Sequence, residues 1–222
     1  MYVRSPFLSG MAKREDFLAQ LSGSSVLAKA LRFFVMNGTE CFCAEDISRL
    51  TSLPRASVRR ETAFLFKIGI VKKCSLVREE TKGSGKRRKT KKVRMPGWAL
   101  NKNFEHLSAL KLFVRSVSPV QSETIPGKLR GIGKLSLVVA SGSFVGESDG
   151  GRIDLLIVGD KLDERRLKKA LHDIEVDLGQ EVRYAAFPTE EFRYRLNIYD
   201  KLVRDVFDEE HQVLFDRLGL VK

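Results

Sequence analysis

The chain has 222 residues, and its 40 lysines and arginines exceed its 28 aspartates and glutamates, which gives a formal net charge of +12. A hydrophobic fraction of 43% is enough for one or two folded domains and excludes a chain that is disordered throughout. No apolar run approaches the ~18–20 residues of a membrane-spanning helix. Charged residues from Lys13 to Asp16 interrupt the first segment, so we expect a cytoplasmic protein without a secretion signal.

The positive charge is confined to the first half of the chain. Residues 1–125 contain 24 lysines and arginines against 10 acidic residues, whereas residues 126–222 contain 16 against 18. This asymmetry predicts a basic module that binds a polyanion and a nearly neutral second module. A stretch rich in serine and proline begins at Ser116 and marks the boundary. We therefore expect an N-terminal extension at 1–22, a first domain at 23–116, a linker at 117–130 and a second domain at 131–222.

The first domain is expected to contain three helices followed by two strands. Ser24 can cap a helix that ends at Asn37, a short helix spans about 44–50, and Pro54 suits the first turn of a third helix that Gly69 ends. The inner face of this third helix is predicted from helical spacing to hold Val58, Thr62, Leu65 and Ile68. Apolar residues then predict strands near 70–77 and 93–100, joined by a tip at 82–92 with seven basic residues.

Three helices with a short turn between the second and third, followed by a basic hairpin, are typical of a winged helix-turn-helix. The stretch from Asp46 to Glu61, together with the exit Lys67-Ile68-Gly69-Ile70, resembles ArsR-type winged-helix regulators over roughly residues 24–115. The resemblance implies that the third helix lies in the major groove of double-stranded DNA, with the hairpin on the phosphate backbone. It also implies a homodimer on a two-fold DNA site.

Small residues and arginines on the outer face of the third helix fit close approach to base edges and phosphates. The side chains that we expect to contact DNA are Arg55, Ser57, Arg59, Arg60, Lys67, Lys86, Arg87, Arg88 and Lys89. The alternative interpretation is that the arginines form a solvated helix face and that the tip is a solubilising loop.

Three cysteines, an odd number, do not predict a disulfide framework. The segment Cys41-Phe42-Cys43 resembles the Cys-x-Cys segment of arsenic-sensing ArsR members, but no third cysteine follows nearby. Since tight selection of a thiophilic metal usually needs three soft ligands, we expect small buried side chains here and no metal site.

The second domain is expected to alternate strands and helices. Strands are predicted at 135–140, 153–158 and 181–187, and a helix at 162–178. Thr189 can cap a single long final helix, one face of which would carry Phe192, Leu196, Tyr199, Val203 and Val206. The fold class of the whole chain is therefore α+β: a winged helix-turn-helix domain followed by a small mixed-sheet α/β domain.

A buried strand, the pair Gly142-Ser143, a short loop and the strand Ile153 to Val158 resemble the minimal nucleotidyltransferases of the DNA polymerase β type, over about residues 128–205. That resemblance implies a pair of carboxylates, one residue apart on a strand, that hold Mg²⁺. Here Asp154 fits the second carboxylate, while Arg152 stands at the first position and Arg183 near the expected third. Because a cation opposes metal binding, we expect no catalytic residue, no metal and no cofactor.

Two roles remain open for this domain. Gly142, Ser143, Arg152 and Asp154 could form a remnant that senses a nucleotide or a phosphate. Alternatively, the domain is a scaffold or dimerisation unit in which Asp154 is exposed or caps a neighbouring turn. The sequence as a whole predicts a DNA-binding transcriptional regulator, and the competing hypothesis is a Mg²⁺-dependent nucleotidyltransferase that holds its substrate with the winged helix. The isolated histidines, His106, His172 and His211, are expected at the surface.

Overall fold

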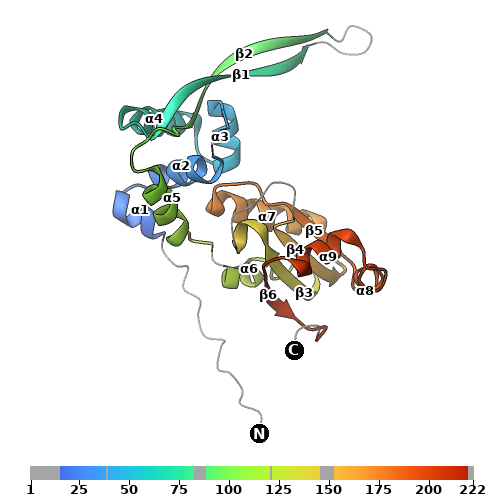
Figure 1. Cartoon of the computed structure of the whole chain (residues 1–222). Helices are drawn as coiled ribbons and strands as arrows, with labels where there is room; N and C mark the ends of the chain where they lie inside the picture. The colour runs from blue at the N-terminus through green and yellow to red at the C-terminus, as the bar shows by residue number, and fades with distance from the viewer. Residues whose placement is uncertain (1–15, 39, 83–88, 121, 146–152, 220–222) are drawn as a thin grey trace.

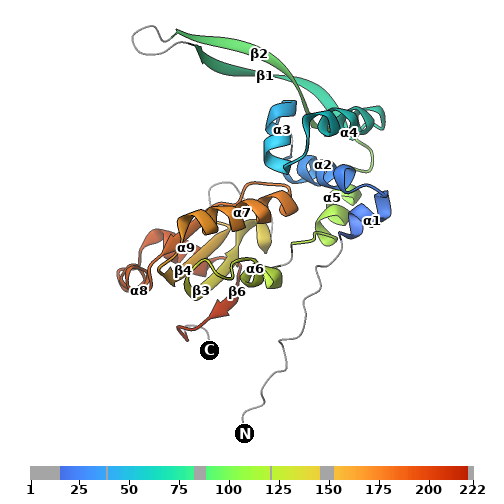
Figure 2. The ribbon, with the colours of Figure 1, turned by 180° about the vertical axis from the view of Figure 1, so that it is seen from behind.

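The computed structural model describes residues 16–38, 40–82, 89–120, 122–145 and 153–219, and the side chains of 80–82, 89 and 90 lie outside this description. Within these residues the fold is mixed α+β: N-terminal helices with a β-hairpin, then a four-stranded mixed sheet with helices. Figures 1 and 2 show the first unit stacked on the second, with the hairpin pointing away from both. None of the described helices is long and apolar enough to cross a membrane.

The first unit contains α1 (Phe17–Ser22), α2 (Ser25–Met36), α3 (Ala44–Thr51), α4 (Arg55–Lys67), β1 (Val71–Lys82), β2 (Lys89–Leu100) and α5 (Leu107–Ser116). The hydroxyl of Ser24 caps α2 by accepting from the backbone N–H of Leu27 at 3.1 Å. The helices bury one common core in which Phe33, Ile47 and Val58 are fully inaccessible. Ile68, expected on the inner face of α4, is 44% exposed because α4 ends before it, at Lys67.

The hairpin is longer than the sequence pattern predicted. β1 and β2 pair antiparallel from Val71 opposite Leu100 to Lys82 opposite Lys89. At its base, Phe42 exchanges two backbone hydrogen bonds with Trp98 of β2, at 3.0 and 2.9 Å. The chain just before α3 is therefore attached to the base of the hairpin, while the outer part of β1 and β2 extends beyond the helices (Figure 1).

The second unit contains β3 (Lys134–Ser141), the 3₁₀ turn η3 (Gly142–Phe144), β4 (Leu155–Asp160), α7 (Glu164–Leu178), β5 (Tyr184–Phe187), α8 (Thr189–Asn197), α9 (Lys201–Asp208) and β6 (His211–Asp216). Its strand order is β5-β4-β3-β6, with β4 parallel to β5 and the other pairs antiparallel. The apolar central strands bury both faces: Val138 and Ile157 pack with α7, and Leu156 packs with α8 and α9.

The single long helix predicted after Thr189 is wrong, because the chain forms α8 and α9 instead. Tyr199, between them, has a left-handed φ of 53° and is 80% exposed, so it does not share the buried face of Phe192. The carboxylate of Asp200 then starts α9 by accepting from the backbone N–H groups of Leu202 and Val203. Strand β6, which the sequence pattern did not predict, completes the sheet beside β3.

Residues 117–130, expected as a linker, include the 3₁₀ turn η2 (Ser122–Thr124) and α6 (Ile125–Lys128). Ile125 and Leu129 are fully buried in the core of the second unit, beneath α7. Leu18 of α1 is likewise buried in the first core, although 1–22 was expected as an extension. Of these two segments, the described residues 16–22 and 122–130 therefore belong to the packed units.

The two units touch through α2 and α3 on one side and α7 on the other. The side-chain amide of Asn37 donates to the carbonyl oxygens of Phe33 at 2.7 Å and of Gly179 at 2.6 Å. The side chain of His172 is partly exposed, as expected. Its ring also contacts the first unit, since it lies 3.1 Å from the hydroxyl of Ser52. A Cβ atom at Gly179 would lie only 3.0 Å from the backbone nitrogen of Phe33, which shows how closely the units approach.

Candidate nucleic-acid interface and the Asp154 site

The solvent face of α4 is cationic. Arg55, Arg59, Arg60 and Lys67 are exposed, and Ser57 is partly buried between them. The opposite face fixes the helix, since Val58, Thr62 and Leu65 are buried against α2 and α3. All five α4 residues that the sequence selected are therefore at least partly accessible to solvent, and the exposed rings of Phe64 and Phe66 lie among them.

Two of these arginines form ion pairs within the first unit. Arg55 lies 3.3 Å from the carboxylate of Glu45 and Arg60 lies 2.9 Å from that of Glu61. Hydrogen bonds from its own backbone N–H and from Cys43 lower the pKa of Glu45, and the charges of Arg55 and Arg59 add to this. Since exposed ion pairs contribute only ~0–1 kcal/mol, a phosphate can replace Glu45 as the partner of Arg55 at little cost. The Glu61 side chain is only 9% exposed, so its carboxylate depends more strongly on Arg60.

The hairpin adds a second set of cations, of which the sequence pattern singled out only Lys91 and Lys92, as part of the basic tip. Lysines and arginines along both strands are exposed: Lys72, Lys73, Arg78, Lys91, Lys92 and Arg94. Arg78 is ion-paired with Asp46 of α3, and the Lys73 ammonium lies 5.0 Å from the ring centre of Phe66 on α4. The high density of lysines and arginines in 72–78 and 89–94 was the signal that could have found the others. Lys86, Arg87 and Arg88 lie outside the described residues, as does the side chain of Lys89.

The expectation that the cysteines form no disulfide is wrong, because Cys41 is bonded to Cys74 of β1. The Phe42–Trp98 pairing brings the segment before α3 to the base of the hairpin, where Gly97 has no side chain to block Cys41. Cys43 is buried as expected, and burial and a hydrogen bond to Asp46 raise the pKa of its thiol. With Cys41 in a disulfide, Cys41 and Cys43 cannot together offer two thiolates to a metal.

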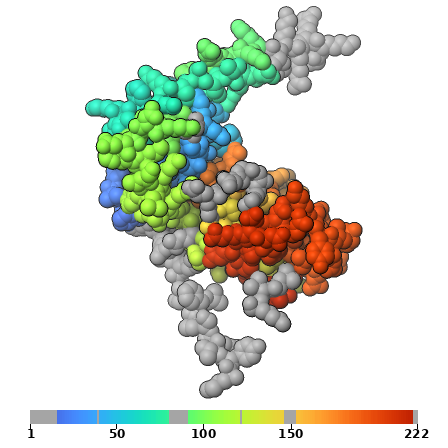
Figure 3. All heavy atoms as spheres, in the orientation of Figure 1, coloured from blue at the N-terminus to red at the C-terminus, as the bar shows by residue number. Residues whose placement is uncertain are grey.

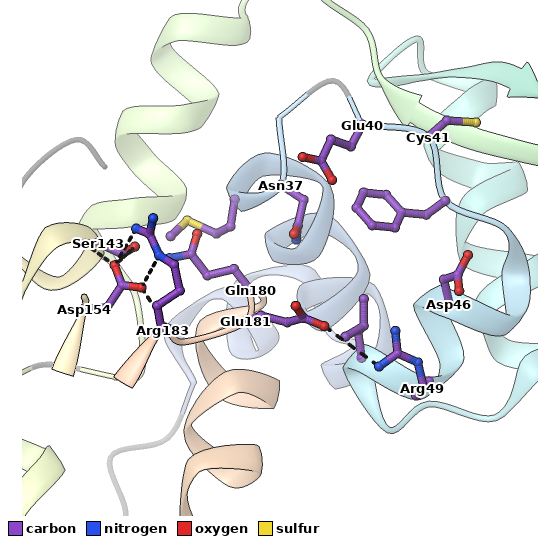
Figure 4. A pocket seen from close by; sticks show the side chains of 13 residues that line it. Asn37, Glu40, Cys41, Asp46, Arg49, Ser143, Asp154, Gln180, Glu181 and Arg183 are labelled. Carbon is purple, nitrogen blue, oxygen red and sulfur yellow. Dashed lines mark hydrogen bonds and ion pairs between the residues drawn. The ribbon is translucent and has the colours of Figure 1, made fainter. Parts of the chain in front are cut away.

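The second candidate site surrounds Asp154, which lies just before β4 and has a side chain only 1% exposed. Its Oδ1 accepts from the backbone N–H and the hydroxyl of Ser143, at 2.9 and 2.6 Å. Its Oδ2 accepts from the backbone N–H and the Nε of Arg183, at 2.9 and 3.0 Å (Figure 4). Burial would raise the pKa of Asp154, but the hydrogen bonds from Arg183 and Ser143 outweigh burial and hold the pKa below its ordinary value.

These contacts decide between the alternatives for Asp154. The carboxylate is buried and not exposed, and it caps the turn η3 through Ser143. The backbone N–H of Ser143, which the nucleotidyltransferase resemblance would direct to a phosphate, is already bound. Gly142 has φ 51°, and a Cβ atom there would lie 2.6 Å from Asp154 Oδ1, so the Gly142-Ser143 pair is explained by this contact alone. Arg152 lies outside the described residues.

The Asp154 site opens into a pocket of about 460 Å³ between the two units (Figure 4). Met36, Asn37, Glu40 and Arg49 line it from the first unit, and Ser143, Gln180, Glu181 and Arg183 line it from the second. Glu181 points across the pocket to Arg49, with 3.8 Å between their charged atoms. Within the described residues, His, Cys, Asp and Glu side chains form no group of three that could hold a metal ion.

Comparison of the chain with protein-family models, with curated proteins and with solved structures finds no match.

Proposed function

We propose that the chain is a sequence-specific DNA-binding transcriptional regulator. Residues 23–116 form an ArsR-like winged helix-turn-helix, in which α3 and α4 are the helix-turn-helix and β1 and β2 the wing. Residues 131–222 form a nucleotidyltransferase-like domain without activity. The observation that carries this proposal is the exposed cationic face of α4 beside a long hairpin that also carries exposed cations.

The arrangement suits a duplex because the two cationic surfaces are presented by different elements. A helix fits the major groove, where arginine can form two hydrogen bonds with guanine. The hairpin extends beyond the helices (Figure 3), so its lysines can reach the neighbouring phosphates. We assign base contacts to Arg59 and Arg60 and phosphate contacts to Arg55, Lys67 and the hairpin.

Self-association is part of the proposal. The exposed apolar side chains of α1 and α5 include Phe17, Leu21, Leu112 and Phe113, and the rings of Phe17 and Phe113 are 6.5 Å apart, so these two rings form one apolar surface. An exposed apolar surface of this kind favours association, and a two-fold dimer would place two α4 helices on one DNA site. Sedimentation equilibrium should show a dimer, and a monomer at all concentrations would contradict this part.

The first test compares two DNA-binding variants by fluorescence anisotropy. Replacing Arg59 and Arg60 with alanine should weaken binding to the selected site by ~1–3 kcal/mol for each arginine that reads a base edge. Neutralising Lys86, Arg87, Arg88 and Lys89 should instead weaken binding to all sequences and flatten the dependence of affinity on salt.

The matched control is the double change Arg165→Ala and Arg193→Ala, which removes the same charge from exposed positions of α7 and α8. This variant should bind DNA as the parent does. Equal affinity of the parent and the Arg59 and Arg60 variant would contradict the assignment of α4 to the major groove.

The competing function, Mg²⁺-dependent nucleotidyl transfer, is tested with labelled nucleoside triphosphates. Both oxygens of the Asp154 carboxylate accept hydrogen bonds within the protein, and one partner is a guanidinium, so a divalent ion would have to displace Arg183. We expect no incorporation of label. Incorporation that Asp154→Asn abolishes would refute the proposed loss of activity and would favour the enzyme.

A further inference from the structure

The disulfide joins two elements of the proposed DNA-binding surface. Cys41 lies in the short segment just before α3. Cys74 lies in β1, opposite Gly97 of β2. The backbone of Phe42 is paired with Trp98, so the same short segment is attached to β2 by hydrogen bonds and to β1 by a covalent bond. The disulfide therefore fixes the base of the hairpin relative to α3.

Gly97 indicates that this corner is built around the two sulfurs. A Cβ atom on Gly97 would lie 2.9 Å from the Sγ of Cys41 and 2.6 Å from the carbonyl oxygen of Phe42, which is closer than packed atoms approach. Gly97 itself is buried, whereas Cys41 and Cys74 are partly exposed. A small reductant in solution can therefore reach the disulfide.

The third cysteine does not compete for this bond. Cys43 is 1% exposed, its thiol donates to Asp46 Oδ2 at 3.0 Å, and burial raises its pKa. Because the thiolate is the form that attacks a disulfide, Cys43 is poorly suited to exchange. The chain thus holds one accessible disulfide and one shielded thiol.

We propose that the Cys41–Cys74 pair is a redox-responsive clamp that sets the position of the hairpin and thereby the affinity for DNA. The effect on DNA rests on the proposed function; the effect on the hairpin does not. In the oxidised state the hairpin is held beside α3 and α4 before DNA arrives. In the reduced state the hairpin keeps the Phe42–Trp98, Arg78–Asp46 and Lys73–Phe66 contacts and the core packing of Val71 and Leu100, but it loses its covalent link to the segment before α3. Part of the ordering of the hairpin must then occur on binding.

The reaction is thiol–disulfide exchange with a dithiol reductant. One thiolate of the reductant attacks a sulfur of the pair, which forms a mixed disulfide and releases the other cysteine as a thiolate. The second thiol of the reductant then displaces the remaining cysteine. Two electrons and two protons pass to Cys41 and Cys74, and the reductant leaves as a cyclic disulfide.

The test uses the full-length protein with and without dithiothreitol. Reduction should weaken DNA binding roughly 3- to 10-fold, a range typical of the ordering cost of about one side chain. It should also speed hydrogen exchange of the β1 and β2 amides near the base of the hairpin, with α7 as the internal reference. The Cys43→Ser variant keeps the disulfide and should respond as the parent does, whereas Cys41→Ser with Cys74→Ser should resemble the reduced parent and ignore dithiothreitol.

The possible outcomes distinguish the disulfide itself, its effect on DNA binding and its effect on the hairpin. Mass spectrometry that finds three free thiols in the air-exposed protein would overturn the proposal. Equal DNA affinity in the two redox states would overturn the effect on binding while leaving the DNA-binding function intact. If neither state bound DNA, the proposed function would fail, and exchange rates would decide the clamp: faster exchange on reduction supports it and unchanged exchange overturns it. Since reduction of the parent needs no mutation, misfolding of a serine variant does not affect this test.

Discussion

Asp154 and Arg183 depend on each other. Asp154 is almost inaccessible to water, while the Arg183 side chain is 38% exposed. A guanidinium left alone at such a position can still be solvated, but a buried carboxylate cannot. The two partners of this ion pair are therefore not equivalent.

Arg183→Ala should destabilise the fold by ~3 kcal/mol, at the lower end of the range for breaking a buried ion pair, because the carboxylate keeps two hydrogen bonds from Ser143 and one from the backbone N–H of residue 183. Adding Asp154→Asn to Arg183→Ala should recover part of the loss, since the buried charge is then gone. Urea denaturation measures both values. Additive losses in the double variant would show that the pair is not coupled.

Helices α8 and α9 are separated by the backbone conformation of one residue. Tyr199 has φ 53°, and a left-handed conformation costs an L-residue with a side chain roughly 1–2 kcal/mol relative to glycine. The ring of Tyr199 is 80% exposed, so it contributes little packing. The turn is therefore determined by its neighbours, among them Asp200 at the start of α9.

Tyr199→Gly should stabilise the protein by ~1 kcal/mol, because glycine adopts this φ without strain. The matched control is Tyr194→Gly: this tyrosine is also exposed, at 65%, but it lies within α8, where glycine should cost ~1 kcal/mol. Chemical denaturation distinguishes the two. Destabilisation by both changes would mean that the Tyr199 side chain packs in a way that matters more than its backbone.

Across the whole molecule, the contact between the units determines whether they behave as one body. Gly179 ends α7 with φ 83° and lies against the backbone of Arg32 and Phe33 in α2. Gly131 has φ 81°, but a Cβ atom there would meet nothing within 4 Å. The two glycines thus have nearly the same φ, but only Gly179 lies against the other unit.

Gly131→Ala should therefore cost only the ~1–2 kcal/mol of a left-handed alanine. Gly179→Ala should cost more and should also separate the units, since its Cβ atom would meet α2. Calorimetry of the parent should show the two units unfolding together, and Gly179→Ala should split or broaden that transition. Identical behaviour of the two variants would mean that the units are not coupled through this contact.

Much of the local structure followed from the sequence because its causes are local. Helical spacing and caps located α2, α3, α4 and α7, and continuous apolar runs located β3 and β4. Helical spacing also predicted which residues of α4 are buried, and the outer face of α4 was then the side opposite to them. Helical spacing failed for α8 and α9, because the apolar residues keep a helical spacing on both sides of Tyr199. The left-handed backbone of Tyr199, which separates the two helices, is visible only in the structure.

The sequence alone established the charge asymmetry and predicted the mixed α+β composition, since these depend only on residue identity and spacing. Tertiary structure decided which distant groups meet: Cys41 with Cys74, Asp154 with Arg183 and Asn37 with Gly179. No periodicity encodes such contacts, because each depends on the packing of elements separated by tens of residues. Their geometry follows from how hydrophobic cores fix those elements in space.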